Sequence, residues 1–247
     1  LYHLIFIDKI KNIMKICLIG KNLTNLVLAK NLANKNLSVD IIFNKNTKKS
    51  FSQRTLAISK ENFNFLLKMN SQLKKIAWPV KNIKIYNDKN NSKELLEFKN
   101  KKKENFFLVK YTDIFNIFEK ICKKSINIKL KKLDYQHQKN NFYLERNYKL
   151  IINSDKSRNL NYKKIEKNYD SLAYTATLIH EKKLNNEAIQ IFTKYGPLAF
   201  LPLSKSKTSV VFSIMNKFKI SETKILDLIK QYNFKYKIKN ISKMKNL

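Results

Sequence analysis

The stretch from Phe192 to Met215 constrains the fold most strongly, because it gathers residues that interrupt regular structure. It holds one of the two glycines and two of the three prolines in 247 residues. Gly196 begins a turn, and a short apolar run (198–201), a polar turn (204–207) and an apolar run rich in β-branched residues (208–214) follow in that order. Two apolar runs joined by a polar turn predict a β-hairpin.

The formal net charge of +33 comes almost entirely from lysine. Of the 51 Lys and Arg residues only three are Arg, and the lysines are spread along the whole chain. Arginine is the residue that recognition of phosphates and base edges favours. The composition therefore favours a solvated lysine surface over a nucleic-acid site, and it also suits contact with anionic lipid.

The chain is long enough to bury a sizeable core. Its hydrophobic fraction of 43% is typical of a globular protein. Cys17 and Cys122 lie far apart without metal-ligand spacing, so we expect both to be buried thiols in a reducing compartment. No apolar run reaches the roughly 18 residues that a membrane-spanning helix needs.

Residues 1–13 precede the first methionine, Met14, which directly precedes a strand-like run. The segment is too short and too charged for a secretory signal. We expect it to be an extension before the true start at Met14; the alternative is a short amphipathic N-terminal extension.

A strand–helix–strand pattern follows Met14. Residues 15–19 are an apolar strand ending at Gly20, residues 22–35 have helical spacing of apolar positions, and residues 37–43 form a second apolar strand. This order over about 30 residues predicts the βαβ unit of a dinucleotide-binding fold.

The glycine fingerprint of such a unit is incomplete here. G-x-G-x-x-G would place Gly at 20, 22 and 25, but the chain has Gly20, Asn22 and Asn25. Asn tolerates positive φ, so Asn22 is a partial substitute. The acid that holds a ribose hydroxyl should end the second strand, near Phe43 or Asn44, and neither is acidic. A βαβ unit that binds no nucleotide remains the alternative.

The rest of the chain alternates helices and short strands. Ser59 is a candidate N-cap, as is Ser221 for a final helix over 220–232. Residues 111–124 have the spacing of an amphipathic helix. Short apolar runs predict strands at 83–86 and 106–109, and a β-meander at 126–130, 133–137, 142–144 and 148–152.

Several segments resemble the ubiquinone-biosynthesis hydroxylases, which are FAD-dependent aromatic monooxygenases with the p-hydroxybenzoate hydroxylase fold. GPLAFLPL followed by TSVVFS resembles the family's "GPLALLPL…SLVW". YDSLAYTATLIHE (169–181) resembles "Y.Q.ALVATV.HE", and LIINSDKSR (150–158) resembles "LLVGADGxxSxVR". The resemblance runs from Met14 to Met215, roughly the first two-thirds of a family member, and the family's third motif, "GDAAH", has no match. The sequence therefore predicts a C-terminally truncated chain.

The resemblance implies cofactor-binding roles for particular residues. Arg54 matches an Arg that lies close to the flavin, and Asp155 matches the Asp of the flavin and nicotinamide motif. The residues expected to bind the cofactor are Gly20, Asn22, Asn25, Arg54 and Asp155.

Other positions depart from the family or lack a role. Thr112 and Phe115 stand where the family has a cofactor-contacting Arg pattern, so that contact is lost or replaced. We expect His180 and Glu181 to be an exposed pair at a strand end rather than an acid–base pair, and no catalytic residue or metal ligand is assigned.

The resemblance also implies a fold and a function. The expected fold is α/β: a Rossmann-like FAD-binding βαβ domain with an inserted, mostly antiparallel β-sheet substrate domain. The flavin-binding part would span 14–170, and 171–247 would hold the substrate-side sheet and the start of the truncated region.

The implied activity is hydroxylation of the aromatic ring of a ubiquinone precursor, a polyprenylated phenol, with FAD as cofactor and NAD(P)H as co-substrate. The expected location is the cytoplasm, with peripheral contact to the inner membrane or to other ubiquinone-biosynthesis enzymes left open. Two alternatives remain: a non-catalytic remnant of the fold, and a basic module that binds nucleic acid or a membrane surface.

Overall fold

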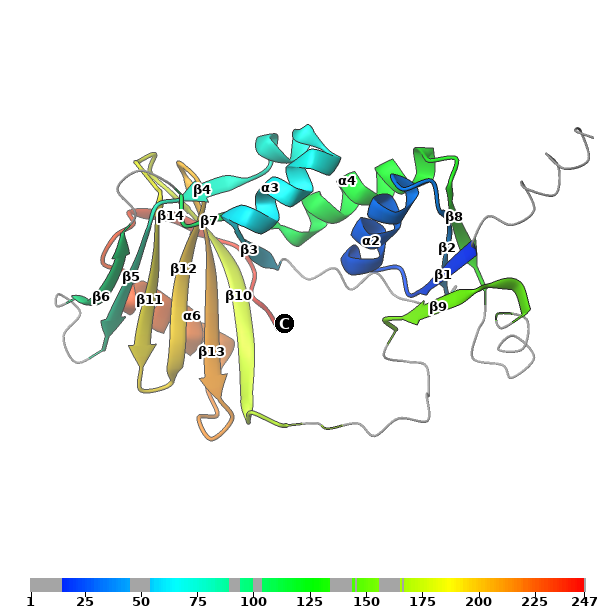
Figure 1. Cartoon of the computed structure of the whole chain (residues 1–247). Coiled ribbons are helices and arrows are strands. Elements are labelled where there is room, and N and C mark those ends of the chain that lie inside the picture. Colours follow the sequence, from blue (N-terminus) through cyan, green and yellow to red (C-terminus); the bar gives the residue numbers. More distant parts are fainter. Residues whose placement is uncertain are drawn as a thin grey trace, which may run out of the picture. The chain divides into compact units, whose positions relative to one another are not determined.

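The computed structural model describes residues 15–44, 54–88, 94–99, 104–133, 144, 146–155, 165 and 167–246 (Figure 1). The chain divides into two units, each made of two separate segments. Unit 1 comprises 1–50 and 114–165, and unit 2 comprises 51–113 and 166–247. The domain boundary expected at residue 170 stays a prediction.

Unit 1 contains a four-stranded parallel sheet in the order β8-β2-β1-β9. The strands are β1 (Lys15–Ile19), β2 (Ser38–Phe43), β8 (Ile128–Lys132) and β9 (Leu150–Asn153), and α2 (Leu23–Ala33) connects β1 to β2. The predicted βαβ unit is therefore confirmed. Parallel strands in such units are buried on both faces, which explains why residues 16–19 of β1 and 39–42 of β2 are all buried.

A second helix, α4 (Tyr111–Lys124), matches the predicted bounds, and its part from residue 114 onward lies in unit 1. The thiol of Cys122 on α4 lies 3.4 Å from the carbonyl oxygen of Leu26 on α2, so the two helices are neighbours. Cys122 and Cys17 are both buried, as expected. Burial raises the pKa of the Cys122 thiol to about 12, which makes it a packing residue rather than a nucleophile.

The meander predicted between residues 126 and 152 is wrong for the part of it that the structure describes. β8 pairs with β2 and β9 pairs with β1, both in parallel, so the two strands lie on opposite edges of one sheet. Leu144 lies in a helical turn, with its carbonyl accepting the N–H of Tyr148. Residues 134–143 of the predicted meander lie outside the described residues. Lys- and Asn-rich connections look alike whether they lead to a neighbouring or a distant strand.

Unit 2 contains an eight-stranded sheet that is antiparallel except between β5 and β11. The order is β14-β10-β13-β12-β11-β5-β6, with β15 also pairing with β10. The strands are β5 (Asn82–Asn87), β6 (Glu94–Lys99), β10 (Ser171–His180), β11 (Glu187–Thr193), β12 (Gly196–Ser204), β13 (Lys207–Met215), β14 (Ile238–Ile241) and β15 (Lys245–Asn246). The expected mostly antiparallel sheet is confirmed, and so is the hairpin, which is β12–β13.

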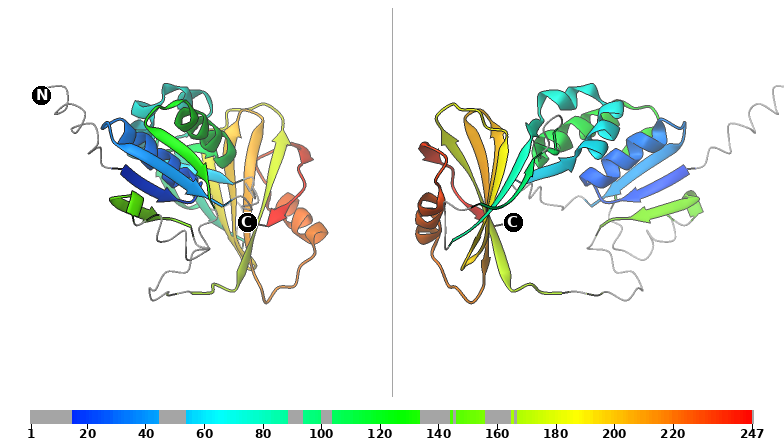
Figure 2. Two further views of the ribbon diagram at one scale, coloured as in Figure 1. Left: turned by 90° about the vertical axis from the view of Figure 1, so that its right-hand side faces the viewer. Right: turned by 60° about the vertical axis from the view of Figure 1, so that its left-hand side comes forward.

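The helix α6 (Glu222–Tyr232) covers one face of this sheet (Figure 2). Its N-cap is Ser221, as predicted, and the Ser221 hydroxyl accepts the N–H of Lys224 at 3.3 Å. Its buried residues, among them Leu228 and Ile229, join side chains of β10 to β13 in one core cluster. This layer explains why β12 and β13 alternate between buried and half-buried positions.

A small three-stranded sheet completes unit 2, in the order β3-β7-β4. Its strands are β3 (Thr55–Ser59), β4 (Trp78–Val80) and β7 (Phe106–Lys110), and the 3-10 helix η1 (Ser71–Lys75) precedes β4. Ser59 caps α3 (Lys60–Met69), as the sequence predicts. Val80 and Leu108 pack with Ala188 of β11, so this sheet contacts the large one.

Candidate nucleotide-binding site

The loop after β1 is a tight turn centred on Gly20, the one glycine retained from the fingerprint. Gly20 has φ +103°, and its N–H donates to the carbonyl of Ile42 at 2.8 Å. A Cβ here would lie 3.3 Å from atoms of Asn22, Ser154 and Asp155. The backbone conformation and the crowding both favour glycine, so this position keeps the geometry of a nucleotide-binding turn.

Asn22 begins α2 as its N-cap. Its side-chain oxygen accepts the N–H of Asn25 at 3.0 Å, and its amide nitrogen donates to the hydroxyl of Ser154 at 2.7 Å. Its φ is −125°, so the idea that Asn replaces glycine here through a positive φ is wrong. The physical reason is that an N-cap residue takes an extended conformation, which any residue can adopt.

Asn25, the third fingerprint position, is 1% exposed. Its amide donates to the carbonyls of Ile19 (3.0 Å) and Gly20 (2.7 Å). The side chain therefore holds the turn from inside the protein. A glycine at this position in the fingerprint allows close helix–strand packing, and Asn25 replaces that packing with hydrogen bonds.

Ser154 and Asp155 follow β9, the parallel neighbour of β1. The Ser154 N–H donates to the carbonyl of Ile19 at 3.1 Å, and its hydroxyl lies 3.2 Å from the same oxygen. The structure thus brings Gly20, Asn22 and Asp155 together at the carboxyl ends of two adjacent parallel strands, where open α/β sheets bind ligands. Sequence reasoning missed Ser154, although it stands next to Asp155 in the same motif.

Lys21 brings positive charge to the N-terminal end of α2. Its ammonium forms an ion pair with Glu119 on α4 and lies 5.0 Å from the ring centroid of Phe43. Burial acts to raise the pKa of Glu119, but hydrogen bonds and charges from Lys21 and Lys123 lower it below its usual value. The first turn of α2 contains no acidic residue, so the positive end of the helix dipole suits an anion.

The end of β2 offers no acid for a ribose. β2 ends at Phe43, and Asn44 follows it. The described residues therefore fit the diphosphate of a dinucleotide better than its ribose. The Gly20 turn and the α2 N-terminus suit phosphate, whereas Asn22 stands where the fingerprint has the glycine that lets a diphosphate approach the backbone.

Arg54 belongs to unit 2, unlike the other four expected site residues. It is exposed and directly precedes β3, and its carbonyl accepts the N–H of Tyr111 at 2.8 Å. Of the two family Arg positions on α4, Phe115 is buried and packs in the core, and the Thr112 hydroxyl contacts Asp113. The cofactor role expected for Arg54 stays a prediction.

The expectation of an exposed pair at His180 and Glu181 is confirmed for Glu181 and wrong for His180. Glu181 is exposed and lies 3.7 Å from Lys237, whereas His180 is 2% exposed. The His180 ring hydrogen-bonds to the Glu181 carbonyl (2.8 Å) and the Thr208 hydroxyl (3.0 Å), and it contacts the ring of Tyr236. Residue 180 continues the inward-facing positions of β10 and is therefore buried under the segment after α6.

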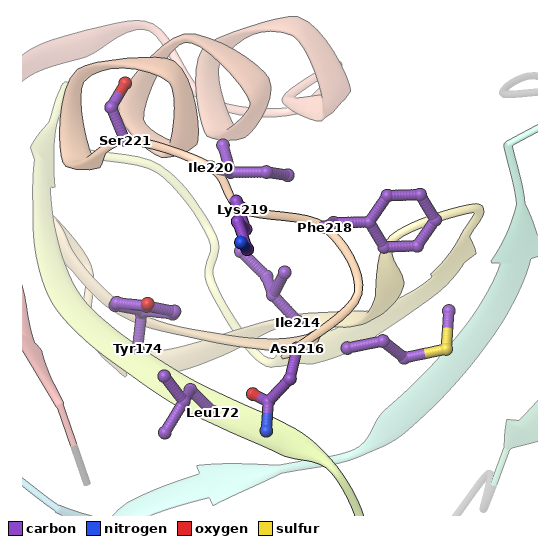
Figure 3. A pocket seen from close by; sticks show the side chains of 9 residues that line it. Leu172, Tyr174, Ile214, Asn216, Phe218, Lys219, Ile220 and Ser221 are labelled. Atoms are coloured by element: carbon purple, nitrogen blue, oxygen red, sulfur yellow. The ribbon is translucent and has the colours of Figure 1, made fainter.

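A cavity of about 490 Å³ lies in unit 2 between β10 and the connection from β13 to α6 (Figure 3). Leu172 and Ile214 contribute apolar walls, and Tyr174 and Lys219 contribute polar groups. None of the expected site residues lines it. No group of three or more His, Cys, Asp or Glu residues within the described ranges is placed to hold a metal ion. Among the described helices, none combines the length and apolarity needed to cross a membrane.

No family model matches the chain, and no curated protein matches it. The chain does match solved structures. The chain is similar to p-nitrophenol 4-monooxygenase from Pseudomonas putida, with a TM-score of 0.66 and 11% identity over 95% of this chain and 68% of that one. The tetrameric form of 2-methyl-3-hydroxypyridine-5-carboxylic acid oxygenase gives a TM-score of 0.69 with 6% identity over 95% of this chain and 72% of that one.

A third similar structure is a probable FAD-dependent monooxygenase from Pseudomonas aeruginosa. The TM-score is 0.60 and the identity is 9%, over 83% of this chain and 61% of that one. The chain therefore spans less than two thirds of that protein's length. The fold is that of the FAD-dependent aromatic monooxygenases, the p-hydroxybenzoate hydroxylase-like fold, and the similarity does not single out the ubiquinone-biosynthesis hydroxylases.

Proposed function

We propose that this chain has the activity of an FAD-dependent aromatic-ring monooxygenase. The observation that carries the proposal is the Gly20 turn, which leads from β1 into α2 beside the end of β9 within a fold shared with such enzymes. Fold alone does not determine function, so the site has to support it. The Gly20 turn and the N-terminus of α2, which suits an anion, both support the proposal.

The residues that would hold FAD are those around the loop. The backbone at Gly20 and the N-terminus of α2 would take the diphosphate, Lys21 would contribute positive charge, and Asp155 would lie at the edge of the site. When bound, FAD supplies the oxygen-activating redox chemistry, and NAD(P)H is the proposed reductant. The Asn22 amide would first have to leave Ser154, which weakens binding by the energy of that hydrogen bond.

The proposed substrate is an electron-rich phenol. The resemblance of GPLAFLPL and TSVVFS to the ubiquinone-biosynthesis hydroxylases favours a polyprenylated ubiquinone precursor. Such a substrate is carried by a membrane, and a surface with net charge +33 would favour peripheral docking on anionic lipid at the cytoplasmic side.

A non-catalytic remnant of the fold is the second candidate. It is favoured by the side chains that replace glycine, because Asn22 and Asn25 both form hydrogen bonds that hold the loop without a ligand. The absence of an acid at Phe43 and Asn44 points the same way. In this case the loop would be stable empty and FAD would bind weakly.

An FAD titration of the purified chain, followed by flavin absorbance and fluorescence, separates the two candidates. We expect Asn22→Gly to bind FAD about tenfold more tightly than the parent chain, a change of about 1.4 kcal/mol, because it opens the path to the backbone. At an N-cap this substitution costs only a few tenths of a kcal/mol of helix stability. Asn34→Gly, at the C-cap of the same helix, is the matched control and should leave the affinity unchanged.

The outcomes are distinct. Saturable binding that strengthens in Asn22→Gly supports the flavoenzyme. If neither the parent chain nor Asn22→Gly takes up FAD, the non-catalytic candidate replaces it. If Asn22→Gly binds more weakly than the parent chain, Asn22 is itself a ligand of the cofactor.

A further inference from the structure

The cavity in unit 2 has no part in the proposed cofactor chemistry, and all of its lining residues belong to the described ranges. Side chains of β10 and β13 form one side of it, and the connection from β13 to α6 forms the other (Figure 3). Its volume of about 490 Å³ lies within the roughly 300–1,000 Å³ that is typical of small-molecule pockets. The cavity is therefore large enough for a ligand.

The cavity lies on the face of the eight-stranded sheet that α6 covers. Ile214 of β13 is 3% exposed and belongs to the core cluster that includes α6, and Tyr174 of β10 packs against the same cluster. Because side chains alternate along a strand, Leu172 points to the same face as Tyr174. Leu172 is 48% exposed, so the cavity opens to solvent beside it. A ligand can enter there without displacing α6.

Most of the wall is apolar. It consists of aliphatic side chains, one thioether and one aromatic ring, contributed by Leu172, Ile214, Met215, Phe218 and Ile220. Apolar walls offer water few hydrogen-bond partners, and a flexible methionine adapts to ligands of irregular shape. The wall therefore favours an apolar ligand body over trapped water.

The polar groups of the cavity are suited to donating hydrogen bonds. The Ser221 hydroxyl already caps α6. Within the described ranges, no hydrogen bond or ion pair is found for the Tyr174 hydroxyl, the Asn216 side-chain amide or the Lys219 ammonium. All three groups can donate, and no lining residue is acidic. A negatively charged ligand group would satisfy them.

The same residues argue against other ligand charges. A cation would be repelled by Lys219, and the ring of Phe218 already has the ammonium of Lys217 at 5.2 Å from its centroid. A dianionic phosphate would usually be bound by arginine or by several cations, whereas this cavity offers one lysine. The first turn of α6 contains Glu222, which opposes the helix dipole, so the preference for a monoanion rests on the side chains.

We propose that this cavity binds an amphipathic monocarboxylate of the medium-chain fatty-acid class. The alkyl chain packs against Leu172, Ile214 and Phe218, and the carboxylate accepts hydrogen bonds from Lys219 and Tyr174. Burial of the chain supplies most of the affinity, and the charged hydrogen bond selects the head group. The site requires no flavin, so it stands or falls independently of the proposed activity.

Isothermal titration calorimetry of the parent chain with decanoate, kept below the concentration at which it forms micelles, tests the proposal. We expect saturable binding at one site. Decan-1-ol and decyltrimethylammonium have the same alkyl chain with a neutral and a cationic head, and each should bind about tenfold more weakly or worse. An ionic strength of about 0.15 M, where the Debye length is about 8 Å, suppresses attraction to distant lysines.

Reversing the charge of Lys219 gives the sharpest variant. Lys219 is exposed, so Lys219→Glu leaves the core intact. It should weaken decanoate binding by about tenfold or more and reverse the preference, so that decyltrimethylammonium binds more tightly than decanoate. Lys205→Glu makes the same change of charge in the exposed β12–β13 turn, at the other end of β13, and should leave the decanoate affinity unchanged.

The methionine methyl groups report where the ligand binds. The chain has four methionines, and Met215 lines the cavity, whereas Met69 ends α3. In the NMR spectrum of methyl-labelled chain, decanoate should shift the Met215 signal and leave the Met69 signal in place. Met215→Leu removes the first signal and so assigns it.

Three results overturn the proposal. One is the absence of saturable decanoate binding to the parent chain. Another is an equal loss of affinity in Lys205→Glu and Lys219→Glu, which would show attraction to the basic surface in general. The third is saturable binding that leaves the Met215 methyl signal unshifted, because the ligand would then occupy another place.

Discussion

At the scale of single residues, the two described glycines are not equally replaceable. Gly196 has φ +137°, and a Cβ there would lie 2.1 Å from the backbone oxygen of Ser213 on β13. Gly20 has φ +103°, but a Cβ there would meet three side-chain atoms at 3.3 Å, and side chains can move. Gly196 is therefore required by the packing of β12 against β13, and Gly20 is required mainly by its backbone conformation.

We expect Gly196→Ala to lower the free energy of unfolding by about 3 kcal/mol or more, because the backbone of β12 or β13 must shift. Gly20→Ala should cost less, about 1–2 kcal/mol, from its positive φ alone. Urea unfolding followed by circular dichroism measures both. Equal losses in the two variants would contradict the assignment of the larger effect to the contact with Ser213.

The sequence predicted which residues stand at the cofactor loop but not what they do. Gly20, Asn22 and Asn25 were found from the spacing of the fingerprint, which is local. The partner of the Asn22 amide is Ser154, 132 residues away, and no local pattern contains that contact. The burial of His180 was missed for the same reason, since Thr208 and Tyr236 cover it from distant segments.

At the scale of elements, one buried carboxylate links three strands of unit 1. Asp40 on β2 is 0% exposed, and its Oδ2 lies 2.8 Å from the ammonium of Lys131 on β8 and 3.3 Å from that of Lys15 on β1. The hydroxyl of Tyr148 donates to the same oxygen. Burial acts to raise the pKa of Asp40, but the hydrogen bonds from Lys131 and Tyr148 and the two lysine charges lower it below its usual value.

This shift predicts the direction of acid destabilisation. An Asp has a pKa of about 3.9 in an unfolded chain. Because the folded pKa is lower, Asp40 contributes stability that is present above about pH 4 and is lost as the pH falls through the folded pKa. Asp40→Asn should lose about 1–3 kcal/mol at neutral pH and should show a shallower decline below about pH 4 than the parent chain.

Urea unfolding at a series of pH values checks this expectation. Asp227→Asn, on the exposed side of α6, removes the same charge without touching the three-strand contact and serves as the control. An acid profile that is identical in the parent chain and in Asp40→Asn would show that the Asp40 contacts do not stabilise the fold.

Elements with local signals were predicted well. The βαβ unit, the β12–β13 hairpin and the caps at Ser59 and Ser221 all follow from apolar spacing, turn residues and capping residues. The positions of β8 and β9 were not predicted. Which strand a segment pairs with depends on the burial available in the assembled sheet, and nearby sequence does not record it.

At the scale of the whole molecule, the net charge of +33 opposes compaction. We expect the melting temperature to rise by about 2–4 °C, equivalent to about 1 kcal/mol, between low salt and an ionic strength of about 0.15 M. NaCl and KCl should act alike, because screening depends on ionic strength. A melting temperature that is constant or falls over this range would show that the lysines are already neutralised by local pairing.

The fold class could be predicted from the sequence, because motif order along the chain matched a known α/β arrangement. Which segments of the chain make up each of the two units could not be predicted from the sequence. Residues 51–113 join 166–247 because β5 pairs with β11, a contact between segments about 100 residues apart. Such pairing is decided by the complete sheet and not by either segment.

Interleaving of the two units has a consequence for the chain as it leaves the ribosome. β1 is the earliest of the described strands, and its neighbour β9 follows about 135 residues later, as the Ser154–Ile19 separation shows. At about 5–20 residues per second, the edge of β1 that pairs with β9 stays unpaired for on the order of ten seconds. Meanwhile β5 has emerged and waits for β11 in turn. The four-stranded sheet and the eight-stranded sheet therefore cannot be complete until the second segment of each unit has been translated.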